Sequence, residues 1–209
     1  MIINYDQLNN INKYLKNFPN AKLQIVTKNQ DEKTVKELID KGYYIFGENK
    51  VQEAQDKFKN LNNPSVDLHL IGPLQTNKVK IALSLFHCIQ SIDRIKLVNE
   101  IAKCITKIKP KTKNFYIQVN IGKESQKSGI YPEYLKDLYD LCLEKKLTIH
   151  GLMCIPPIDR PCEDYFSEMK SIRDDLNPNL LLSMGMSNDY KISLECGANL
   201  IRVGSRIFL

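Results

Sequence analysis

Short apolar runs alternate with helical patterns along the whole chain, and this alternation restricts the possible folds more than any other feature. The runs with the length and composition of buried strands lie at residues 22–27, 43–46, 66–71, 86–90, 114–119, 147–153, 180–184 and 200–204. Most of the segments between them carry apolar residues at helical spacing, as in 93–108. Strands that alternate with helices form a parallel sheet, because each parallel connection has to cross back over the sheet.

The number of predicted strands fits a closed (β/α)8 barrel, and an open doubly wound sheet is the alternative. A dinucleotide-binding sheet of the second kind needs Gly-x-Gly-x-x-Gly after its first strand, and this chain has no such motif there. The sequence also contains no repeat, linker or low-complexity break. We therefore expect residues 1–209 to form a single α/β domain, a (β/α)8 TIM barrel, with a short N-terminal helix at about 4–16 before the first strand.

Composition and charge argue against several classes of protein. The apolar fraction of 43% and the net charge of +6 are ordinary for a soluble globular chain. The densest run of lysines, within 103–113, reads as a solvated helix end and loop, so nucleic-acid binding is the less favoured alternative. No apolar run approaches the roughly 18 residues of a membrane span, and the first residues lack the basic start and apolar core of a signal peptide. We expect a cytoplasmic protein without a membrane partner.

The cysteines and histidines do not predict a metal site. The 6 cysteines lie far apart, form no Cys-x-x-Cys, and have no histidine at the spacing of zinc ligands. His69 lies inside a predicted strand, where a histidine with hydrogen-bond partners in the core is the better interpretation. We expect no metal.

Polar residues and glycines follow several of the predicted strands. In a barrel of this kind the carboxyl ends of the strands meet at one face, which is where active sites lie. Lys28 ends the first strand. On its position alone it could be a solvated lysine, whereas an amine buried enough to lose its proton could form an imine with an aldehyde.

The last two strands end in residues suited to an anion. Gly204 and Ser205 can present backbone N–H groups at the start of a turn. Ser187 can cap the helix predicted at 188–196, donate to a phosphate, or do both. The loops after strands seven and eight are the usual phosphate site of this barrel.

Arg202 lies among apolar neighbours and therefore needs a buried partner. A carboxylate such as Glu48 is one candidate, and the pyridine nitrogen of pyridoxal 5'-phosphate (PLP) is the other. A lysine at one strand end and a phosphate cradle at another favour PLP. An arginine does not readily give up its proton, so it would keep the ring nitrogen unprotonated and weaken the ring as an electron sink. This disfavours strong carbanion chemistry and suits a racemase-type site or a carrier.

These residues resemble the YggS/PROSC family of PLP homeostasis (PLP-binding) proteins over nearly the whole chain. The segments that carry the resemblance, in chain order, are Ile25–Lys28, Phe46–Glu53, His69–Lys78, Val119–Ile121, Lys127–Gly129, Gly151–Met153, Leu182–Ser187 and Ile201–Ser205. Three features depart from the family. Thr27 and Asn29 flank the lysine where the family commonly has Ser-Lys-Thr, the N-terminal helix region is short, and the family usually continues beyond the last residues of this chain. We expect the final helix of the barrel to be reduced and the phosphate side to be more exposed.

The resemblance implies a barrel like the N-terminal domain of bacterial alanine racemase. It implies that Lys28 carries PLP as an internal aldimine, with Asn49 beside the cofactor. It further implies roles in PLP binding for four residues at the last two strands, namely Ser187, Gly204 and Ser205 at the phosphate and Arg202 at the ring nitrogen.

Members of this family generally have no established catalytic turnover and are thought to buffer or deliver PLP. We therefore expect a PLP-binding protein that is not an enzyme, with PLP as its small-molecule partner and apo PLP-dependent enzymes as recipients. Lys78 and Lys127 match family lysines and could be secondary acceptors for PLP. A monomer is the favoured state, because the chain has no room for the extra domain that supplies the second base in related racemases.

A PLP enzyme such as an amino-acid racemase is the second hypothesis, and a nucleic-acid or other interaction module that uses the basic surface is the third.

Overall fold

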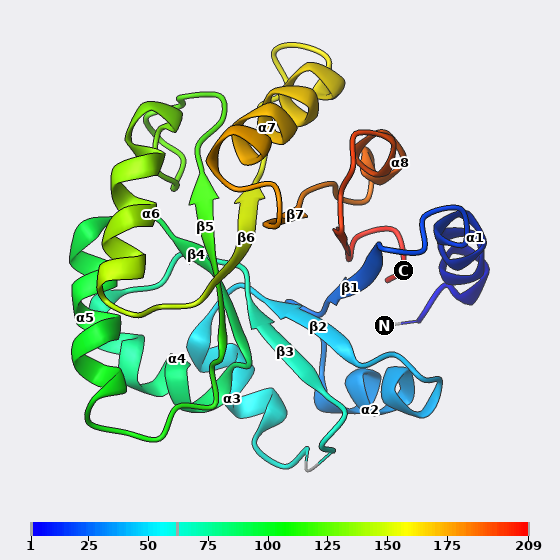
Figure 1. The fold of residues 1–209 in the computed structure, drawn as a ribbon. Coiled ribbons are helices and arrows are strands. Elements are labelled where there is room, and N and C mark those ends of the chain that lie inside the picture. Colours follow the sequence, from blue (N-terminus) through cyan, green and yellow to red (C-terminus); the bar gives the residue numbers. More distant parts are fainter. Residues whose placement is uncertain (1, 62, 209) are drawn as a thin grey trace.

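The eight strands form one closed parallel barrel in the computed structural model, which describes residues 2–61 and 63–208 (Figure 1). Met1, Asn62 and Leu209, at the ends and inside the predicted domain, lie outside the described residues. The strands are β1 (Lys22–Val26), β2 (Ile45–Glu48), β3 (Asp67–Leu70), β4 (Cys88–Ile92), β5 (Asn114–Val119), β6 (Ile149–Cys154), β7 (Leu181–Ser183) and β8 (Leu200–Val203). The barrel closes between β1 and β8, where Gln24 is in register with Arg202. The barrel prediction is confirmed, and the open-sheet alternative is wrong.

The helices α2 to α8 connect consecutive strands, α1 precedes β1, and together they surround the barrel (Figure 1). They are α1 (Tyr5–Leu15), α2 (Glu32–Asp40), α3 (Val51–Phe58), α4 (Val79–Leu85), α5 (Ile95–Ile105), α6 (Leu135–Glu144), α7 (Cys162–Leu176) and α8 (Tyr190–Glu195), with short 3-10 turns at Thr76–Lys78 and Pro132–Tyr134. Polar side chains mark some of the starts: Asp31 caps α2 by accepting a hydrogen bond from the amide of Thr34 at 2.8 Å.

The helix α1 covers the seam between the first and last strands. Its Tyr5 hydroxyl donates to Glu37 of α2 at 2.6 Å, and its Tyr14 hydroxyl donates to Glu195 of α8 at 2.7 Å. After β8 the described residues form a turn, and Phe208 makes a bridge with Ile3. The two ends of the chain accordingly lie close together (Figure 1). The helix α1 therefore lies in the outer ring between α2 and α8.

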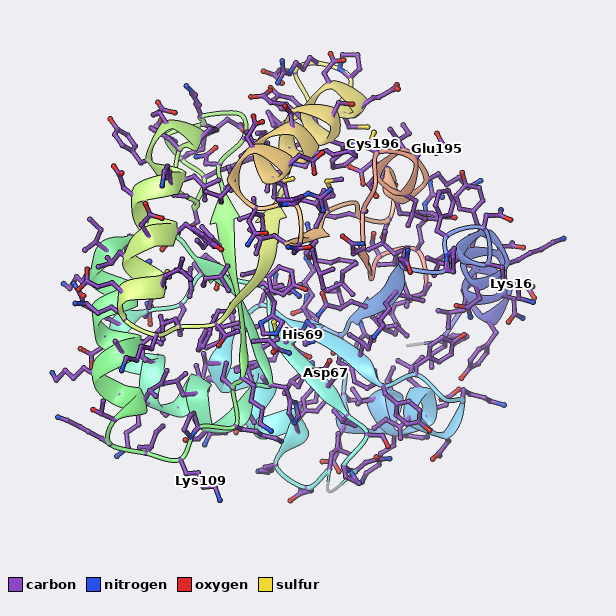
Figure 2. The ribbon with its side chains drawn as sticks, viewed as in Figure 1. Lys16, Asp67, His69, Lys109, Glu195 and Cys196 are labelled. Carbon is purple, nitrogen blue, oxygen red and sulfur yellow. The ribbon has the colours of Figure 1, made fainter. Side chains whose placement is uncertain are left out.

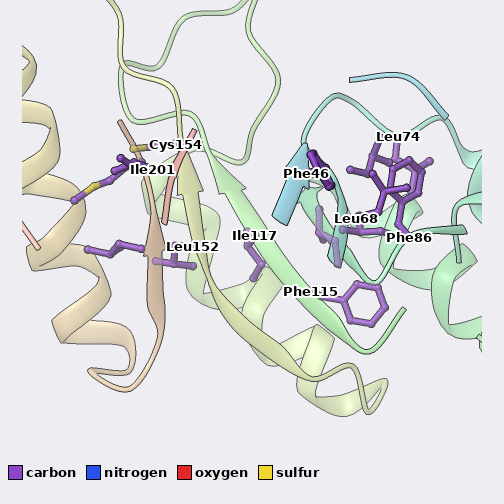
Figure 3. Close-up of a cluster of buried hydrophobic side chains, with 14 of the residues drawn as sticks. Phe46, Leu68, Leu74, Phe86, Phe115, Ile117, Leu152, Cys154 and Ile201 are labelled. Carbon is purple, nitrogen blue, oxygen red and sulfur yellow. The ribbon is translucent and has the colours of Figure 1, made fainter. Parts of the chain in front are cut away.

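Two kinds of side chain alternate along the strands, because successive residues point to opposite faces. Those facing the helices are large and apolar, and they form the main core; Figure 3 shows Phe46, Leu68, Phe115 and Ile117 in this layer. Burial of each such side chain contributes roughly 1.5–3 kcal/mol.

The other face of the strands points into the barrel, and it is mainly polar. A small separate apolar cluster of Cys88, Tyr116 and Met153 lies on the same face. The buried polar residues on this face include Gln24, His69, Gln90, Ser183 and Arg202, each no more than 6% exposed. The barrel interior therefore supports polar chemistry at its open end.

Candidate functional site

A cavity of about 800 Å³ opens at the carboxyl ends of the strands. It is lined by residues from the loops that follow most of the strands, and these include every predicted site residue: Lys28, Asn49, Ser187, Arg202, Gly204 and Ser205. Lys127 also lines this cavity, whereas Lys78, in the 3-10 turn before α4, is not among its lining residues. The structure thus brings together residues that lie as far apart in sequence as 28 and 205.

Lys28 lies just beyond the last residue of β1, and its side chain is exposed. Of the two alternatives for Lys28, the structure agrees with the solvated lysine rather than the buried amine, because the residue follows the end of the strand and lies on the wall of an open cavity. Its backbone is nevertheless held firmly: the amide of Thr27 donates to the carbonyl of Gly47 at 3.0 Å, and Asn29 adopts the left-handed conformation with φ of 62°.

Arg202 is 3% exposed, and its guanidinium donates to two neutral oxygens. Nη1 donates to Ser183 Oγ at 2.8 Å, and Nη2 donates to the carbonyl of Cys154 at 2.7 Å. Burial lowers the pKa of the guanidinium from its usual value. Glu48 is not its partner, so the carboxylate interpretation is wrong: Arg202 is a buried cation whose hydrogen-bond partners are uncharged.

Glu48 pairs instead with Lys57 of α3, a residue that the sequence interpretation missed. Lys57 Nζ lies 2.6 Å from Glu48 Oε1, and both side chains are almost fully buried. Burial raises the pKa of the Glu48 carboxyl, although its hydrogen bonds with Lys57 and Thr27 oppose this shift. The sequence does contain a signal that Lys57 is buried, because this residue lies on the same helix face as the buried Ala54 and Phe58.

Behind Arg202 a chain of hydrogen bonds crosses the barrel interior. Ser183 Oγ donates to Gln90 Oε1 at 2.6 Å, and Gln90 Nε2 lies 2.7 Å from His69 Nδ1. His69 Nε2 lies 3.0 Å from Asp67 Oδ1, and Figure 2 shows these two labelled residues next to each other. His69 is therefore a core histidine with partners, as expected.

The candidate phosphate end of the cavity is formed by residues after β7 and β8. Ser205 Oγ donates to Ser187 Oγ at 3.1 Å, with Ser187 buried and Ser205 exposed. A Cβ on Gly204 would lie 2.9 Å from the carbonyl of Val26, so only glycine fits this position without a shift. Ser187 does not cap the following helix, because α8 begins at Tyr190.

Asn49 is half-buried and follows β2 directly. A Cβ on Gly72 would lie only 2.1 Å from the carbonyl of Asn49, so the loop after β3 packs tightly against the Asn49 backbone. On the opposite side, Asn120 Nδ2 donates to the carbonyls of Glu124 and Lys127 at 2.7 and 3.1 Å. Lys127 Nζ donates in turn to the carbonyl of Pro156 at 3.3 Å, so the Lys127 loop has a fixed shape.

Residues 2–61 and 63–208 contain no group of three His, Cys, Asp or Glu side chains placed to hold a metal ion. No helix in the same part of the chain is long and apolar enough to span a bilayer.

Comparison with known proteins places the chain in a family. The family model for the N-terminal domain of alanine racemase matches residues 3–209. Proteins named pyridoxal phosphate homeostasis protein are 37% identical in Aquifex aeolicus (90% of this chain, 86% of the relative) and 36% identical in Helicobacter pylori (90% and 87%). The solved structure of PipY from Synechococcus elongatus PCC7942 without PLP is 30% identical, with a TM-score of 0.89 over 98% of this chain and 99% of PipY.

More distant structures share the fold alone. An alanine racemase from Clostridium difficile has a TM-score of 0.72 at 13% identity, covering 97% of this chain and 56% of the racemase chain. The barrel and its cavity thus define a protein built on the alanine racemase N-terminal domain. The chain belongs to that family and, within it, to the YggS/PROSC group of pyridoxal phosphate homeostasis proteins.

Proposed function

We propose that the protein binds PLP in this cavity, holds it as an internal aldimine on Lys28, and buffers or delivers it without catalytic turnover. The observation that carries the proposal is Arg202, a buried cation with neutral partners that lines the same cavity as Lys28 and the Ser187–Ser205 pair. The names of the relatives and a second PipY structure with PLP bound, 29% identical with a TM-score of 0.82, support the cofactor.

The residues at each end of the cavity fit the two ends of PLP. The hydroxyls of Ser187 and Ser205 and the backbone at Gly204 can donate to phosphate oxygens. A guanidinium has five N–H donors, and the described contacts of Arg202 use two of its nitrogens. A donor left over can bond the lone pair of the pyridine nitrogen.

An arginine at that nitrogen argues against strong carbanion chemistry, and it suits a carrier or a racemase-type site. PLP supplies an electron sink in catalysis, and this sink is strongest when the ring nitrogen is protonated. Arg202 holds its own proton, because a delocalised guanidinium does not readily give one up even where burial lowers its pKa. The ring is therefore poorly suited to strong carbanion chemistry, which agrees with retention and release of PLP and leaves a racemase-type site as the alternative.

The covalent link needs no further reactant. The neutral amine of Lys28 adds to the aldehyde carbon, one water molecule leaves, and a C=N bond remains. Because Lys28 is exposed, its link can also be reversed by water or by an incoming amine. We propose a cytoplasmic monomer that transfers PLP to apo PLP-dependent enzymes, and this reversibility is what transfer requires.

The test is a visible absorbance spectrum of the purified protein with added PLP, before and after borohydride. We expect an imine band that borohydride removes and a pyridoxyl group that peptide mass mapping places on Lys28. Lys28→Ala is the control and loses both signals. Absence of the band in the wild type, or a pyridoxyl group found only elsewhere, would overturn the proposal.

A further inference from the structure

Three ionisable side chains converge on the backbone around Lys28. Glu48 ends β2, and Glu53 and Lys57 lie one turn apart on α3. These three residues, called the anchoring triad below, come from outside the strand that carries Lys28. None of the three lines the cavity.

Lys57 is the centre of the anchoring triad. Its ammonium donates to the carbonyl of Thr27 at 2.5 Å, to Glu48 Oε1 at 2.6 Å and to Glu53 Oε1 at 3.2 Å. An ammonium group has three protons to donate, so these contacts use all of them. The Lys57 side chain is 4% exposed and has little competition from water.

The contacts of the triad fall on both peptide groups that flank Lys28. Lys57 holds the carbonyl of the Thr27–Lys28 peptide, and Glu48 accepts from the Thr27 hydroxyl at 2.6 Å. On the other side, Glu53 Oε1 accepts from the amide of Asn29, which belongs to the next peptide group, at 2.5 Å. The backbone of Lys28 is thereby fixed before and after its Cα atom, just where β1 has ended.

Stability alone does not explain this arrangement. Burying an ion pair has a desolvation cost, and apolar packing of similar volume often gives equal or greater stability. The anchoring triad instead directs its hydrogen bonds to the one segment where the direction of the Lys28 side chain is determined. A reacting group held in the right geometry reacts faster, and a displacement of about 1 Å can cost on the order of a hundredfold in rate.

We propose that Glu48, Glu53 and Lys57 are positioning residues that aim Lys28 at the cofactor aldehyde and so set the rate of covalent attachment. This inference rests on the proposed function, because it assigns a purpose to the anchoring triad only if Lys28 is the attachment point. It predicts that losing the triad slows attachment without removing any group that touches PLP.

The test uses two variants that leave the cavity lining intact. Glu53→Ala releases the Asn29 amide while the buried pair remains, and the full-length double variant Glu48→Gln/Lys57→Met removes both buried charges together. Glu100→Ala is the matched control, since it also removes a helical carboxylate that pairs with a lysine on its own helix, Lys103 at 3.7 Å. The measurement is the rate at which limiting PLP forms a borohydride-trapped adduct on Lys28, followed by peptide mass mapping.

We expect the double variant to attach PLP on the order of tenfold more slowly than the wild type, Glu53→Ala to be intermediate, and Glu100→Ala to match the wild type. Leu138→Ala, which removes a buried side chain of α6, separates positioning from stability. It should lower the thermal midpoint of the apo-protein and leave the attachment rate unchanged.

Each result bears on a definite claim. If the wild type and both triad variants attach PLP to Lys28 at the same rate, the positioning role is wrong and the proposed function stands. If Leu138→Ala slows attachment as much as a triad variant of equal apo-protein stability, the effect is structural and the inference falls. If the wild type forms no adduct on Lys28, the proposed function and this inference both fail.

Discussion

At the scale of single residues, Arg202 distinguishes this cavity from an ordinary polar cleft. Its charge is buried, and its two described hydrogen bonds go to a hydroxyl and a backbone carbonyl. A charge buried in this way gains most from a further partner, because water cannot supply one.

Replacing Arg202 with methionine should weaken PLP binding by about tenfold to a hundredfold, since a hydrogen bond to a charged group contributes roughly 1.5–3 kcal/mol. The measurement is the dissociation constant from a titration of the imine band.

The double variant Ser187→Ala/Ser205→Ala should weaken binding through the phosphate and leave the wavelength of the band unchanged, because it does not touch the ring. Full retention of PLP through dialysis by both variants would mean that the cavity residues are wrongly assigned.

The six residues predicted from sequence all line the cavity, but sequence did not give all of their contacts. Lys28, Ser187 and Ser205 were predictable because each follows a strand, and strand ends meet at one face. The pairing of Arg202 with Glu48 was wrong because sequence does not say which buried charges are neighbours across the barrel. Burial of Lys57 in α3 provides the nearer partner for Glu48.

At the scale of elements, the contact between β2 and α3 makes stability depend on pH. Burial raises the folded-state pKa of Glu48 above its ordinary 4.5. A carboxyl of this kind binds its proton more tightly in the folded state than in the unfolded state. Its contribution to the free energy of unfolding is therefore largest below pH 4.5 and falls as the pH rises towards the raised pKa.

The variant Glu48→Gln removes the ionisable carboxyl and so tests whether the pKa of Glu48 is raised or lowered in the folded state. Between pH 4.5 and the raised pKa, the unfolding free energy of the wild type should fall relative to the variant, by at most about 1.4 kcal/mol per pH unit. Urea titrations of both proteins in that range give the difference. A wild type that gains stability over the variant as the pH rises would show that Lys57 outweighs burial and lowers the pKa.

Element positions followed from periodicity where the elements were long. The run at 114–119 coincides with β5, and the pattern at 93–108 contains α5. By contrast, no separate range was predicted for α4. That helix has only 7 residues and follows a polar turn, so Val79, Ala82 and Leu83 provide too short a pattern to recognise.

At the scale of the whole molecule, PLP should stabilise the folded state. A ligand at a hundred times its dissociation constant adds about 2.7 kcal/mol when it binds only the folded protein. For a chain of this length, each kcal/mol raises the melting temperature by about 2–4 °C. Calorimetry should show a rise of about 5–10 °C with PLP in the wild type and a smaller rise in Lys28→Ala. Equal rises in the two proteins would mean that the covalent link contributes no stability.

The alternation of strands and helices predicted the barrel, but it did not distinguish carrier from enzyme. That distinction depends on the groups that face the cofactor. Among the described residues that line the cavity there is no tyrosine or histidine. Apart from Lys28, the lining side chains that could accept a proton are Lys127, Cys162 and Asp189. Lys127 lies against Glu124 at 2.5 Å, and Asp189 accepts a hydrogen bond from the amide of Met186 at 2.5 Å.

Racemisation needs one base on each face of the reacting carbon, and Lys28 supplies only one of them. We therefore expect PLP-loaded protein to racemise alanine no faster than Lys28→Ala, as measured by the circular dichroism of the amino acid over many hours. The same loaded protein should restore activity to an apo PLP-dependent enzyme mixed with it. Racemisation clearly above the Lys28→Ala control would contradict the carrier role. The variant Lys127→Met would then show whether Lys127 is the second base, since it would abolish that activity while PLP stays attached.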